Sequence, residues 1–374
     1  MSKSAIVVGA GIVGLATARA LAEKGYTVKV IEKSQFALGA SVRNFGMLWP
    51  VGQPDGILYD RSVRTKEIWT EYLDAANIPY NACGSLHLAY SAEEMNVVED
   101  IAQFFQSKNR PVSVIDKETV LGNYNGINEN GLLGALRSED EIIIDPREGI
   151  KHLPAYLTQK YGVSFIWGTA ITSVTSHAAF AGKTKYAADI VCVCSGQDFE
   201  TLYPDQFKAQ PIIKTKLQMM RFKHKDPNYK IGASVCGGLS LLHYKSFHAS
   251  SALTKLRLKI EEEIPEYLKY GIHVMVSQNN EGELTVGDSH EYALDFEPFD
   301  KTEINEMILA YLKKFMHIDQ WKMTQSWNGI YPIMTNGAAE LFLNPEPGVY
   351  ILNGIGGHGM TMSFGFAEEM IETI

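Results

Sequence analysis

The apolar positions of the first 32 residues follow three successive patterns. AIVV at residues 5–8 is a short β-branched run, which is typical of a buried parallel strand. Apolar residues then recur on one face of a helix, at Ile12, Leu15, Ala18 and Ala22. Gly25 is placed to end this helix, and TVKVIE at residues 27–32 has strand character again. The pattern predicts a strand–helix–strand unit at the amino terminus.

The middle of the chain predicts alternating helices and strands. Helical spacing covers residues 58–77 and 92–108, and a third helix starts at Asp145-Pro146, a capping residue followed by a proline in the first turn. Shorter strand patterns are GSLHLAYS, GLLGALRSEDEIIID, GVSFIWGTAITSV and ADIVCVCSG. From residue 211 the apolar runs are longer and alternate, in PIIKTKLQMMRF, GLSLLHYKSF, IHVMVSQNN and GELTVGDSHEY. These four runs indicate an antiparallel sheet.

The length of 374 residues exceeds what one compact core usually supports, so we expect two domains. The amino-terminal unit and the strand GVYILNG near the carboxyl end suit a parallel α/β domain. The alternating runs after residue 211 suit a second domain of α+β type. The expected fold class is therefore α/β plus α+β.

The first predicted strand leads into Gly9-Ala10-Gly11-Ile12-Val13-Gly14, a G-x-G-x-x-G turn. Gly9 permits the tight turn, Gly11 lets the backbone approach a pyrophosphate, and Gly14 lets the helix lie close to the strand. The helix start then offers amide groups and the positive end of its dipole to phosphates. Glu32, at the end of the second strand, is placed to accept hydrogen bonds from a ribose. The turn predicts a dinucleotide site but leaves NAD and FAD open.

A second glycine-rich turn near the carboxyl end changes that picture. Ile355 to Thr361, IGGHGMT, follows the strand GVYILNG and precedes a helix from about residue 362. A second helix start is therefore aimed at a ligand. An NAD-dependent dehydrogenase needs one such unit for its pyrophosphate, whereas two units at opposite ends of the chain suit a longer cofactor.

Composition and charge exclude several classes of function. The hydrophobic content of 45% and charged content of 21% are ordinary for a soluble globular protein. A net charge of −9 argues against a nucleic-acid surface. The first strand begins almost at once after Met1, and no apolar run is long enough to span a bilayer. Four cysteines without metal spacing fit a reducing cytoplasm.

Further candidates for binding lie outside the two glycine turns. The loop after Glu32 is long and carries Arg43, Asn44 and Trp49, and loops of this length are usually functional. Lys214, Lys216 and Gln218 share one strand face, which could bind an anion, although a solvated sheet face is the more frequent meaning. Three histidines fall in different predicted strands without metal spacing, His243, His273 and His290. We therefore expect no metal site.

Six runs together resemble the D-amino-acid oxidase superfamily, whose members include glycine oxidase and sarcosine oxidase. They are VGAGIVGLATARALAEKGYTVKVIEK, GASVRNFGMLWP, DPREGIKHLPAYL, VCVCSGQDFE, WNGIYP and NGIGGHGMTMSFGFAEEM. The resemblance spans the whole chain and implies FAD held by a discontinuous Rossmann-type domain of residues 1–75, 146–210 and 330–374. It implies an antiparallel-sheet substrate-binding domain of residues 76–145 and 211–329. No cysteine lies near Tyr331, so we expect the FAD to be non-covalent.

The resemblance also implies the residues that hold FAD. Gly9, Gly11, Gly14, Glu32 and Lys33 would bind the ADP half. Ser41, Arg43, Asn44 and Gly46 correspond to the loop along the ribityl chain and flavin ring. Ile171 falls near the adenine, and Gly196 ends the strand that faces the cofactor. Gly356, Gly357, His358, Gly359, Met360 and Thr361 would lie at the pyrimidine edge of the flavin, where the helix dipole stabilises negative charge.

Two departures from the family pattern concern the substrate. Ordinary amino-acid oxidases of this family carry Arg-Pro where this chain has Tyr331-Pro332, and that arginine clamps the substrate carboxylate. The Arg-Gly-Gln that usually opens the substrate sheet corresponds here to Lys216-Leu217-Gln218. Further runs, among them CGSLHLAY, KLQMMRF and GDSHEY, resemble a subgroup associated with phosphonate breakdown.

This closer resemblance implies oxidation of an aminoalkylphosphonate, such as N-methyl-2-aminoethylphosphonate. Hydride would leave the carbon next to the amine for the flavin, the imine would hydrolyse to aldehyde plus amine, and O2 would give H2O2. Tyr331 and His358 are the catalytic candidates, and Tyr331, Lys216, Arg221 and Trp49 the candidates for substrate binding. The alternatives are a glycine, sarcosine or D-amino-acid oxidase, a dehydrogenase that uses an electron carrier, and a non-catalytic FAD-binding or electron-relay subunit. The sequence leaves the oligomeric state open.

Overall fold

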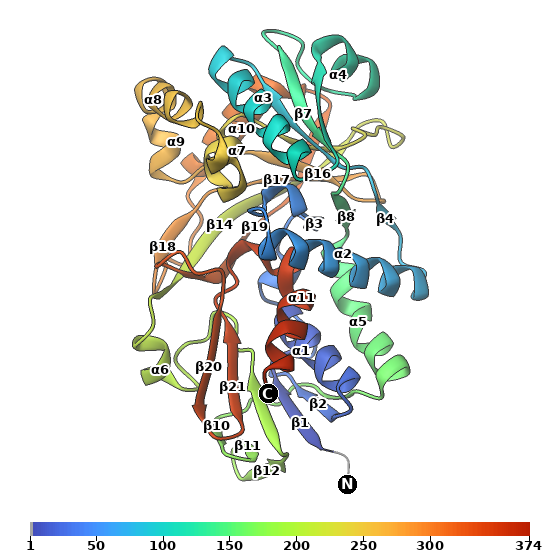
Figure 1. Ribbon diagram of the computed structural model, residues 1–374, viewed down its shortest axis with the longest axis vertical. Coiled ribbons are helices and arrows are strands. Elements are labelled where there is room, and N and C mark those ends of the chain that lie inside the picture. Colours follow the sequence, from blue (N-terminus) through green and yellow to red (C-terminus); the bar gives the residue numbers. More distant parts are fainter. Residues whose placement is uncertain (1–2) are drawn as a thin grey trace.

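The computed structural model describes residues 3–374 and has two halves (Figure 1). The half drawn at the bottom contains a mostly parallel sheet, in the order β20-β21-β13-β1-β2-β9. Its strands are β1 Ser4–Val8, β2 Thr27–Ile31, β9 Ser164–Ile166, β13 Ile190–Val193, β20 Leu341–Glu346 and β21 Val349–Asn353. The sequence therefore predicted the amino-terminal strand–helix–strand unit correctly, and segments from both ends of the chain share one sheet.

The carboxyl ends of β1 and its neighbours meet at one edge of this sheet. Val8 pairs with Val193 on one side and with Ile31 on the other, and both pairings are parallel. β1 is buried on both faces, which its run of apolar residues predicts. Gly9 leaves this edge and donates its backbone N–H to the carbonyl of Ile31 (2.9 Å). The glycine turn is thereby fixed at the edge where ligands bind in open α/β sheets.

Four helices pack around this sheet, α1 Ile12–Glu23, α2 Ile57–Ala75, α5 Pro146–Tyr161 and α11 Gly359–Glu372. α1 and α11 lie side by side in Figure 1, joined at their polar edge by Arg19 and Glu368 (2.7 Å). Asp145 caps α5 by accepting the N–H of Arg147 (2.9 Å), and Pro146 occupies the first turn, as the sequence predicts. These helices bury the apolar face that their spacing indicates.

The upper half is built on a larger sheet, in the order β18-β14-β17-β16-β15-β5-β7-β6, with β19 paired to β14. Its strands are β5 Ser85–Ala89, β6 Val112–Asp116, β7 Gly134–Ser138, β14 Ile212–His224, β15 Ser234–Cys236, β16 Met275–Gln278, β17 Glu283–Gly287, β18 Glu291–Ala293 and β19 Trp321–Met334. β14 and β19 form a long antiparallel pair in which Thr215 faces Tyr331. Apart from β5 with β15, the pairings in this sheet are antiparallel, which confirms the predicted α+β character.

Helices cover the outer side of the upper sheet (Figure 1). They are α3 Ala92–Ser107, α4 Lys117–Asn123, α7 Leu239–His243, α8 Leu253–Glu263, α9 Pro265–Lys269 and α10 Thr302–Phe315. The predicted strand GLSLLHYKSF is wrong, because this run forms α7 and the 3₁₀ turn η3 Lys245–Ala249. Leu239, Ser240, Leu241 and Leu242 are all buried, and a short run buried on every side has no period that separates helix from strand.

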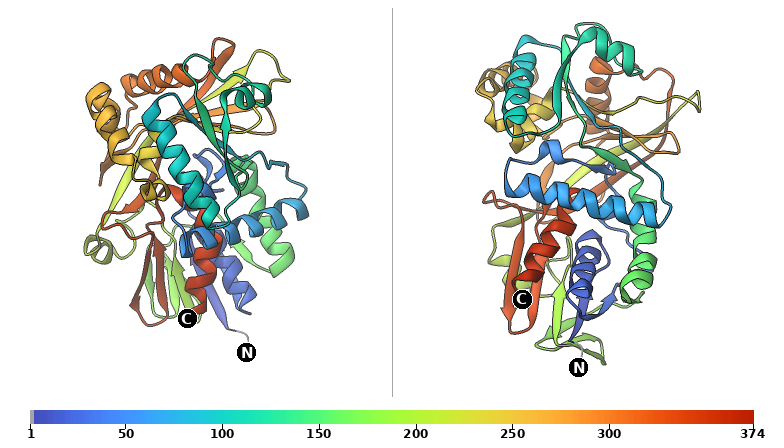
Figure 2. Two further views of the ribbon diagram at one scale, coloured as in Figure 1. Left: turned by 45° about the horizontal axis from the view of Figure 1, so that its top comes forward. Right: turned by 45° about the vertical axis from the view of Figure 1, so that its right-hand side comes forward.

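Smaller elements complete the chain. β3 Met47–Leu48, β8 Ile142–Ile144 and β4 Tyr80–Asn81 form one small sheet, and β10 Ser173–Thr175, β11 Ala178–Ala181 and β12 Thr184–Ala187 form another. The remaining elements are α6 Pro204–Lys208 and the 3₁₀ turns η1 Ala40–Val42, η2 Pro50–Gly52 and η4 Gly356–His358. α2 crosses between the two halves, as the right-hand view of Figure 2 shows.

Candidate active site

A cavity of about 590 Å³ extends along the junction between the two halves. The turn from Gly9 to Gly14 lines one end of it, and Tyr331 and His358 line the other. The loop from Ser41 to Phe45 contributes wall between these ends. The two glycine turns that the sequence places at opposite ends of the chain therefore border one continuous space.

The first glycine turn has no room for side chains. A Cβ atom at Gly9, whose φ is +103°, would lie 2.4 Å from the carbonyl oxygen of Cys194. A Cβ atom at Gly14 would lie 1.9 Å from the carbonyl oxygen of Gly9, so α1 packs directly on the end of β1. Both glycines line the cavity together with Gly11. The backbone is thus accessible to a ligand at the start of α1, as the motif requires.

Ser41 and Glu32 hold the backbone around this turn. The N–H of Ile12 donates to the hydroxyl of Ser41 (2.9 Å), so a loop residue occupies one of the free amides at the start of α1. The carboxylate of Glu32 accepts the N–H of Ala10 (2.8 Å) and the N–H of Ser34 (2.9 Å). Glu32 therefore organises the turn as well as lining the cavity.

The loop after Glu32 lines the middle of the cavity. The side-chain amide of Asn44 donates to the carbonyls of Ala40 and Ser41 (3.0 Å each), which keeps the loop compact. Arg43 is exposed, and its Nη1 donates to the carbonyl of Asn328 (3.3 Å). Gly46 does not line the cavity: its N–H donates to Asn44 (2.8 Å) and its carbonyl accepts from Ile144 (2.8 Å). The prediction that Gly46 touches the ligand is therefore corrected.

The carboxy-terminal glycine turn faces Tyr331. Gly356 has a φ of +65°, and a Cβ atom at Gly357 would lie 3.1 Å from the Tyr331 hydroxyl oxygen. The Nδ1 atom of His358 accepts a hydrogen bond from the side-chain amide nitrogen of Gln53 (3.0 Å), and burial lowers the pKa of His358 to about 4, assisted by the charges of Lys245 and His290. Thr361 accepts the N–H of Trp49 (3.0 Å). All residues predicted from Gly356 to Thr361 line the cavity, as do Ile171, Gly196, Lys33 and Trp49.

Three histidines from separate elements meet at the Tyr331 end of the cavity. His243 ends α7, His273 precedes β16, and His290 lies between β17 and β18. Their potential ligand nitrogens lie within 4.8 Å of one another, and the His243 and His273 rings stack with centroids 3.6 Å apart. The sequence placed these residues in different predicted strands without metal spacing and gave no sign that they meet. Tertiary packing brings them together into one group, which we call the histidine cluster.

Two members of the histidine cluster have polar neighbours, and hydrogen bonds hold one of them. The Nδ1 atom of His290 faces the carbonyl of Gly271 (3.0 Å), and its Nε2 atom lies 3.1 Å from the Tyr331 hydroxyl. The Nε2 atom of His273 lies 3.1 Å from Oδ1 of Asp288, a distance typical of an ion pair. The contact lacks the alignment of a hydrogen bond, so these buried atoms keep unmet hydrogen-bonding capacity.

Burial sets the protonation of this end of the cavity. It lowers the pKa of His243 and of His273 well below the usual histidine value, and the neighbouring histidines lower both further. Burial also lowers the pKa of His290 to about 4, against a smaller opposing effect of its hydrogen bond to Gly271. It raises the pKa of Asp288 well above its ordinary value, and raises that of Tyr331 with assistance from Asp288 and Tyr292. The ligand-free cluster is therefore neutral near pH 7.

Sequence comparison identifies the family. The FAD dependent oxidoreductase (DAO) family matches residues 4–373, nearly the whole chain. This chain belongs to the FAD-dependent oxidoreductase family. Its cofactor is FAD, and the two glycine turns, the start of α1 and the bordering cavity fit that elongated dinucleotide.

Solved structures with the same fold cover almost all of this oxidoreductase. Glycine oxidase from Geobacillus kaustophilus is 18% identical with a TM-score of 0.78, covering 99% of this chain and 94% of its own. L-proline dehydrogenase from P. horikoshii is 19% identical with a TM-score of 0.79, covering 100% and 94%. L-α-glycerophosphate oxidase from Mycoplasma pneumoniae, with FAD bound, is 18% identical with a TM-score of 0.77, covering 100% and 94%. At these identities the likeness establishes the fold.

Curated relatives match a smaller part of the oxidoreductase. The tRNA 5-methylaminomethyl-2-thiouridine biosynthesis bifunctional protein of Campylobacter concisus is 23% identical over 215 residues, 54% of this chain. The corresponding protein of Azoarcus sp. is 33% identical over 99 residues, 25% of this chain. The matched regions span 31% and 16% of those two proteins, so they are considerably longer than the shared segment.

Lys216 and Arg221 lie outside the cavity of the oxidoreductase, and their predicted contact with substrate is corrected. Lys216 is buried on the other face of β14, where its Nζ donates to the carbonyl of Phe299 (2.8 Å) and pairs with Asp300 (3.1 Å). The neighbouring Leu217 faces the cavity instead, because successive side chains of a strand point to opposite faces. The polar face of β14 is therefore covered by chain and not solvated.

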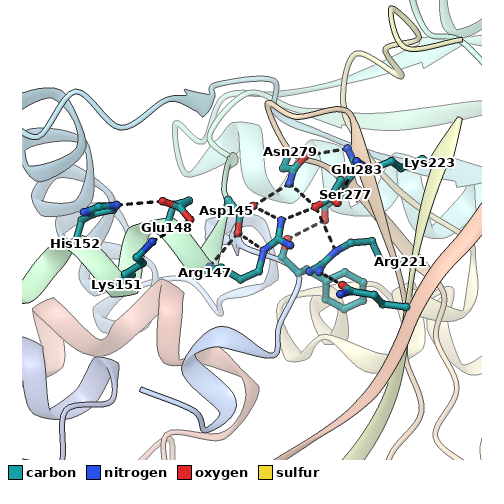
Figure 3. A network of polar contacts seen from close by, with 12 residues as sticks. Asp145, Arg147, Glu148, Lys151, His152, Arg221, Lys223, Ser277, Asn279 and Glu283 are labelled. Carbon is teal, nitrogen blue, oxygen red and sulfur yellow. Dashed lines mark hydrogen bonds and ion pairs between the residues drawn. The ribbon is translucent and has the colours of Figure 1, made fainter. Parts of the chain in front are cut away.

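Arg221 belongs to an ion network farther along β14, beyond the residues that line the cavity (Figure 3). Its Nη1 donates to Gln325 (2.6 Å), its Nε lies 3.7 Å from Glu283, and its guanidinium stacks over Trp327. Glu283 also pairs with Arg147, which is bound to Asp145 by its Nε (2.9 Å). The network joins the start of α5 to the β16–β17 hairpin, so Arg221 serves the junction between the two halves.

Sequence reasoning missed several residues at the Tyr331 end of the cavity. They are His243, Tyr244, His273, Met275, Asp288, His290 and Tyr292. Part of this group could have been found from the sequence, because the pattern of β16 and β17 is that of a hairpin. In that hairpin Met275 pairs with Gly287, which sets His273 beside Asp288. His243 gave no such signal, since its segment was interpreted as a strand.

No helix within residues 3–374 has the length and apolar character needed to cross a membrane.

Proposed function

We propose that this enzyme oxidises an aminoalkylphosphonate, such as N-methyl-2-aminoethylphosphonate, to an aldehyde and an amine. The observation that carries the proposal is the residue at position 331. The family resemblance implies a carboxylate-binding arginine there, whereas this chain has Tyr331, which lines the cavity beside His290. Lys33 and Arg43 are the cationic Lys or Arg side chains among the described residues that line the cavity. Tyr331 thus offers no guanidinium for a carboxylate.

Bound FAD would supply the oxidising chemistry by accepting a hydride from the C–H bond next to the substrate nitrogen. The chain orients that bond and excludes water from it, since Tyr331 and Trp49 are buried in the wall of the cavity. A neutral amine needs no protein base before the hydride leaves. The imine that results takes up water and separates into aldehyde and amine.

Tyr331 and His358 are the residues we assign to the reacting end. The Tyr331 hydroxyl can donate a hydrogen bond to the substrate when it does not donate to His290. His358 holds Nδ1 against Gln53, which leaves Nε2 for the cavity. Trp49 contributes an apolar wall, and its backbone is fixed by Thr361. We also propose that residues 1–75, 146–210 and 330–374 form the FAD-binding domain, with the remaining segments forming the substrate-binding domain.

The names of the solved relatives support an amine substrate. They include glycine oxidase, L-proline dehydrogenase, iminodiacetate oxidase and L-amino acid deaminase, and all four names refer to amino compounds. The name of L-α-glycerophosphate oxidase shows that the same fold also acts on a phosphate ester. An amine that carries a phosphonate combines the two features. We further propose O2 as the acceptor and the cytoplasm as the compartment.

An anaerobic flavin-reduction screen tests the substrate. Purified holoenzyme is mixed with glycine, sarcosine, D-amino acids, 2-aminoethylphosphonate and its N-methyl form, and bleaching of the flavin absorbance is followed. We expect the aminoalkylphosphonates to reduce the flavin fastest by kcat/KM. Faster reduction by a carboxylate amine would replace the proposed substrate with an amino acid. If none of these amines reduces the flavin, the screen points to a non-catalytic FAD-binding subunit.

A parallel measurement tests the electron acceptor. Under air, we expect one H2O2 for each aldehyde formed from N-methyl-2-aminoethylphosphonate. Turnover with an artificial carrier but without peroxide would identify a dehydrogenase.

A further inference from the structure

The histidine cluster has no role in holding FAD by the assignments above. His243, His273 and His290 nevertheless face the same cavity as Tyr331. We propose that these three histidines form the receptor for the anionic end of the substrate, a phosphonate or phosphate-type dianion, and that they take up a proton as it binds. The identity of the anion as part of the substrate rests on the proposed function.

The cluster has the geometry of a receptor with open donors. His290 is held through Nδ1 by the Gly271 carbonyl, so Nδ1 carries a proton and Nε2 faces the cavity side. Both ring nitrogens of His273 lack a well-aligned hydrogen bond although the ring is buried. Buried polar atoms without partners cost free energy, and a ligand that bonds to them relieves that cost. Among the described residues, His273 and His290 thus line the cavity, and the ring of His273 keeps hydrogen-bonding capacity that the protein does not meet.

Charge selects the ligand that this space can bind. Lys33 and Arg43 are the Lys and Arg side chains among the described cavity residues, and both are already engaged, Lys33 with Asp198 (3.0 Å) and Arg43 with the carbonyl of Asn328 (3.3 Å). Proton uptake by imidazole is therefore the available source of positive charge at the Tyr331 end. A dianion raises the pKa of each neighbouring imidazole, and each imidazole that takes a proton from solvent offsets one negative charge. The carboxyl group of Asp288, 3.1 Å from His273, can accept a hydrogen bond from that imidazolium.

Several other titratable groups face the cluster from the elements packed against it. They are Asp288, Tyr331, Tyr244, Tyr292, His358, His248 and His87. Burial raises the pKa of the tyrosines, so these remain neutral donors over the physiological range. Burial lowers the pKa of His87 to about 3, which keeps it neutral as well. The histidines of the cluster are therefore the groups placed to respond to the anion.

A metal ion is the competing occupant, and the ring geometry disfavours it. Imidazole nitrogens bind zinc at about 2.0–2.1 Å, and three of them around one ion lie roughly 3.4 Å apart. The nitrogens here spread to as much as 4.8 Å, and the His243 and His273 rings stack face to face with centroids 3.6 Å apart. Rings that point at one ion do not stack in this way. The geometry favours an anion held by N–H donors.

Binding of simple anions to the FAD-loaded enzyme tests the proposal without turnover. Methylphosphonate, inorganic phosphate and acetate are titrated while the flavin spectrum is followed. Calorimetry in two buffers of different ionisation enthalpy measures proton uptake, corrected for the second ionisation of the ligand. We expect methylphosphonate and phosphate to bind at least tenfold more tightly than acetate, with uptake of about one proton near pH 8. Phosphate that binds more tightly than methylphosphonate would identify a phosphate ester as the source of the dianion.

Variants then locate the receptor. His243→Gln and His290→Gln should each weaken methylphosphonate binding by at least tenfold and abolish the proton uptake, while FAD stays bound. His152→Gln, a substitution at an exposed histidine of α5, serves as the control and should bind as the wild type does. His243→Gln remains informative if His290→Gln fails to fold, because His243 is the exposed member of the cluster whereas His290 is buried.

Three results would overturn the receptor. These are unchanged binding in both histidine variants, binding without proton uptake, and one equivalent of metal whose removal by EDTA abolishes anion binding. Failure of the proposed function looks different. In that case the aminoalkylphosphonates do not reduce the flavin, although methylphosphonate still binds through the histidines.

Discussion

The Nε2 atom of His290 lies 3.1 Å from the hydroxyl oxygen of Tyr331. Because Nδ1 of His290 faces the Gly271 carbonyl, the neutral ring carries its proton on Nδ1. Its Nε2 atom therefore accepts a hydrogen bond from the Tyr331 hydroxyl. A residue that follows β17 thereby orients the side chain of Tyr331. When His290 gains a proton, the Tyr331 hydroxyl is released to donate to another acceptor. The pair therefore links the protonation of the histidine cluster to the substrate contact of Tyr331.

Replacement of Tyr331 by arginine should redirect the substrate preference. In Tyr331→Arg the guanidinium provides a bidentate partner for carboxylates, and we expect the ratio of kcat/KM for sarcosine to that for N-methyl-2-aminoethylphosphonate to rise about tenfold or more. Tyr331→Phe is the control, since it removes the hydroxyl without adding charge. Equal ratios in wild type and Tyr331→Arg would exclude Tyr331 from the substrate site.

Substitution of Gly14 should release the cofactor. In Gly14→Ala the new Cβ atom meets the Gly9 carbonyl oxygen at 1.9 Å, so α1 must move away from β1. We expect FAD affinity to fall at least tenfold, measured from the flavin absorbance that survives gel filtration, and Tm to fall. Gly122→Ala is the matched control, because its Cβ atom has nothing within 4 Å. Full FAD occupancy in Gly14→Ala would contradict the packing argument.

Glu283 should stabilise the junction between the two halves (Figure 3). Burial alone would raise the pKa of Glu283, but its hydrogen bond to Arg147 and the charges of Arg147, Arg221 and Lys223 lower it overall. A lowered carboxyl pKa contributes stability above the unfolded value of about 4.3, and that stability is lost as the pH falls through the folded value. Glu283→Gln should therefore lose roughly 1–3 kcal/mol of unfolding free energy at pH 7 and respond less to acid.

Glu148→Gln is the control for this experiment. Glu148 is about half exposed, and its contacts with Lys151 and His152 lie on the surface of α5. Its replacement should change the unfolding free energy by about 0.5 kcal/mol or less in urea denaturation. Equal losses in the two variants would show that the network around Glu283 adds nothing beyond a surface ion pair.

His87 should make the protein sensitive to acid. Burial lowers its pKa to about 3, below the unfolded value of about 6.5, so the unfolded chain binds the proton more readily. Stability is therefore complete above the unfolded value and decreases as the pH falls below it, by about 2 kcal/mol at pH 5. In His87→Leu this loss should disappear, since leucine fits among Trp49 and Phe247 and does not titrate. His152→Leu should keep the wild-type pH profile of Tm.

The cofactor end of the cavity was predictable because its determinants are local. Gly9, Gly11 and Gly14 act through the backbone of one turn, and a Cβ atom clashes there whatever the rest of the chain does. Glu32 follows the next strand at a spacing that the parallel pairing of β1 and β2 dictates. The residue types at these four positions depend on the geometry of one strand–turn–helix unit, so the sequence alone indicates the conformation of that turn.

The substrate end was predicted less well. Lys216 and Leu217 are neighbours in the chain, and their side chains point to opposite faces of β14. A shift of the strand by one residue would therefore exchange which of them lines the cavity. The alternating pattern of β14 shows two faces but not which one another segment covers. The chain from Glu297 to Asp300 covers the Lys216 face, and the sequence gives no indication of that contact.

The sequence by itself determined the FAD site, the family and the alternation of α/β and α+β segments, because local spacing and backbone sterics encode them. The tertiary structure alone decided that His243, His273 and His290 share one buried space with Tyr331 and that Arg221 does not. These residues are separated by up to 88 positions (His243 to Tyr331), and they meet only through the packing of α7 on the β16–β17 hairpin and of β19 on β14. Long-range packing therefore decides which side chains line the Tyr331 end of the cavity, while local geometry alone fixes the first glycine turn.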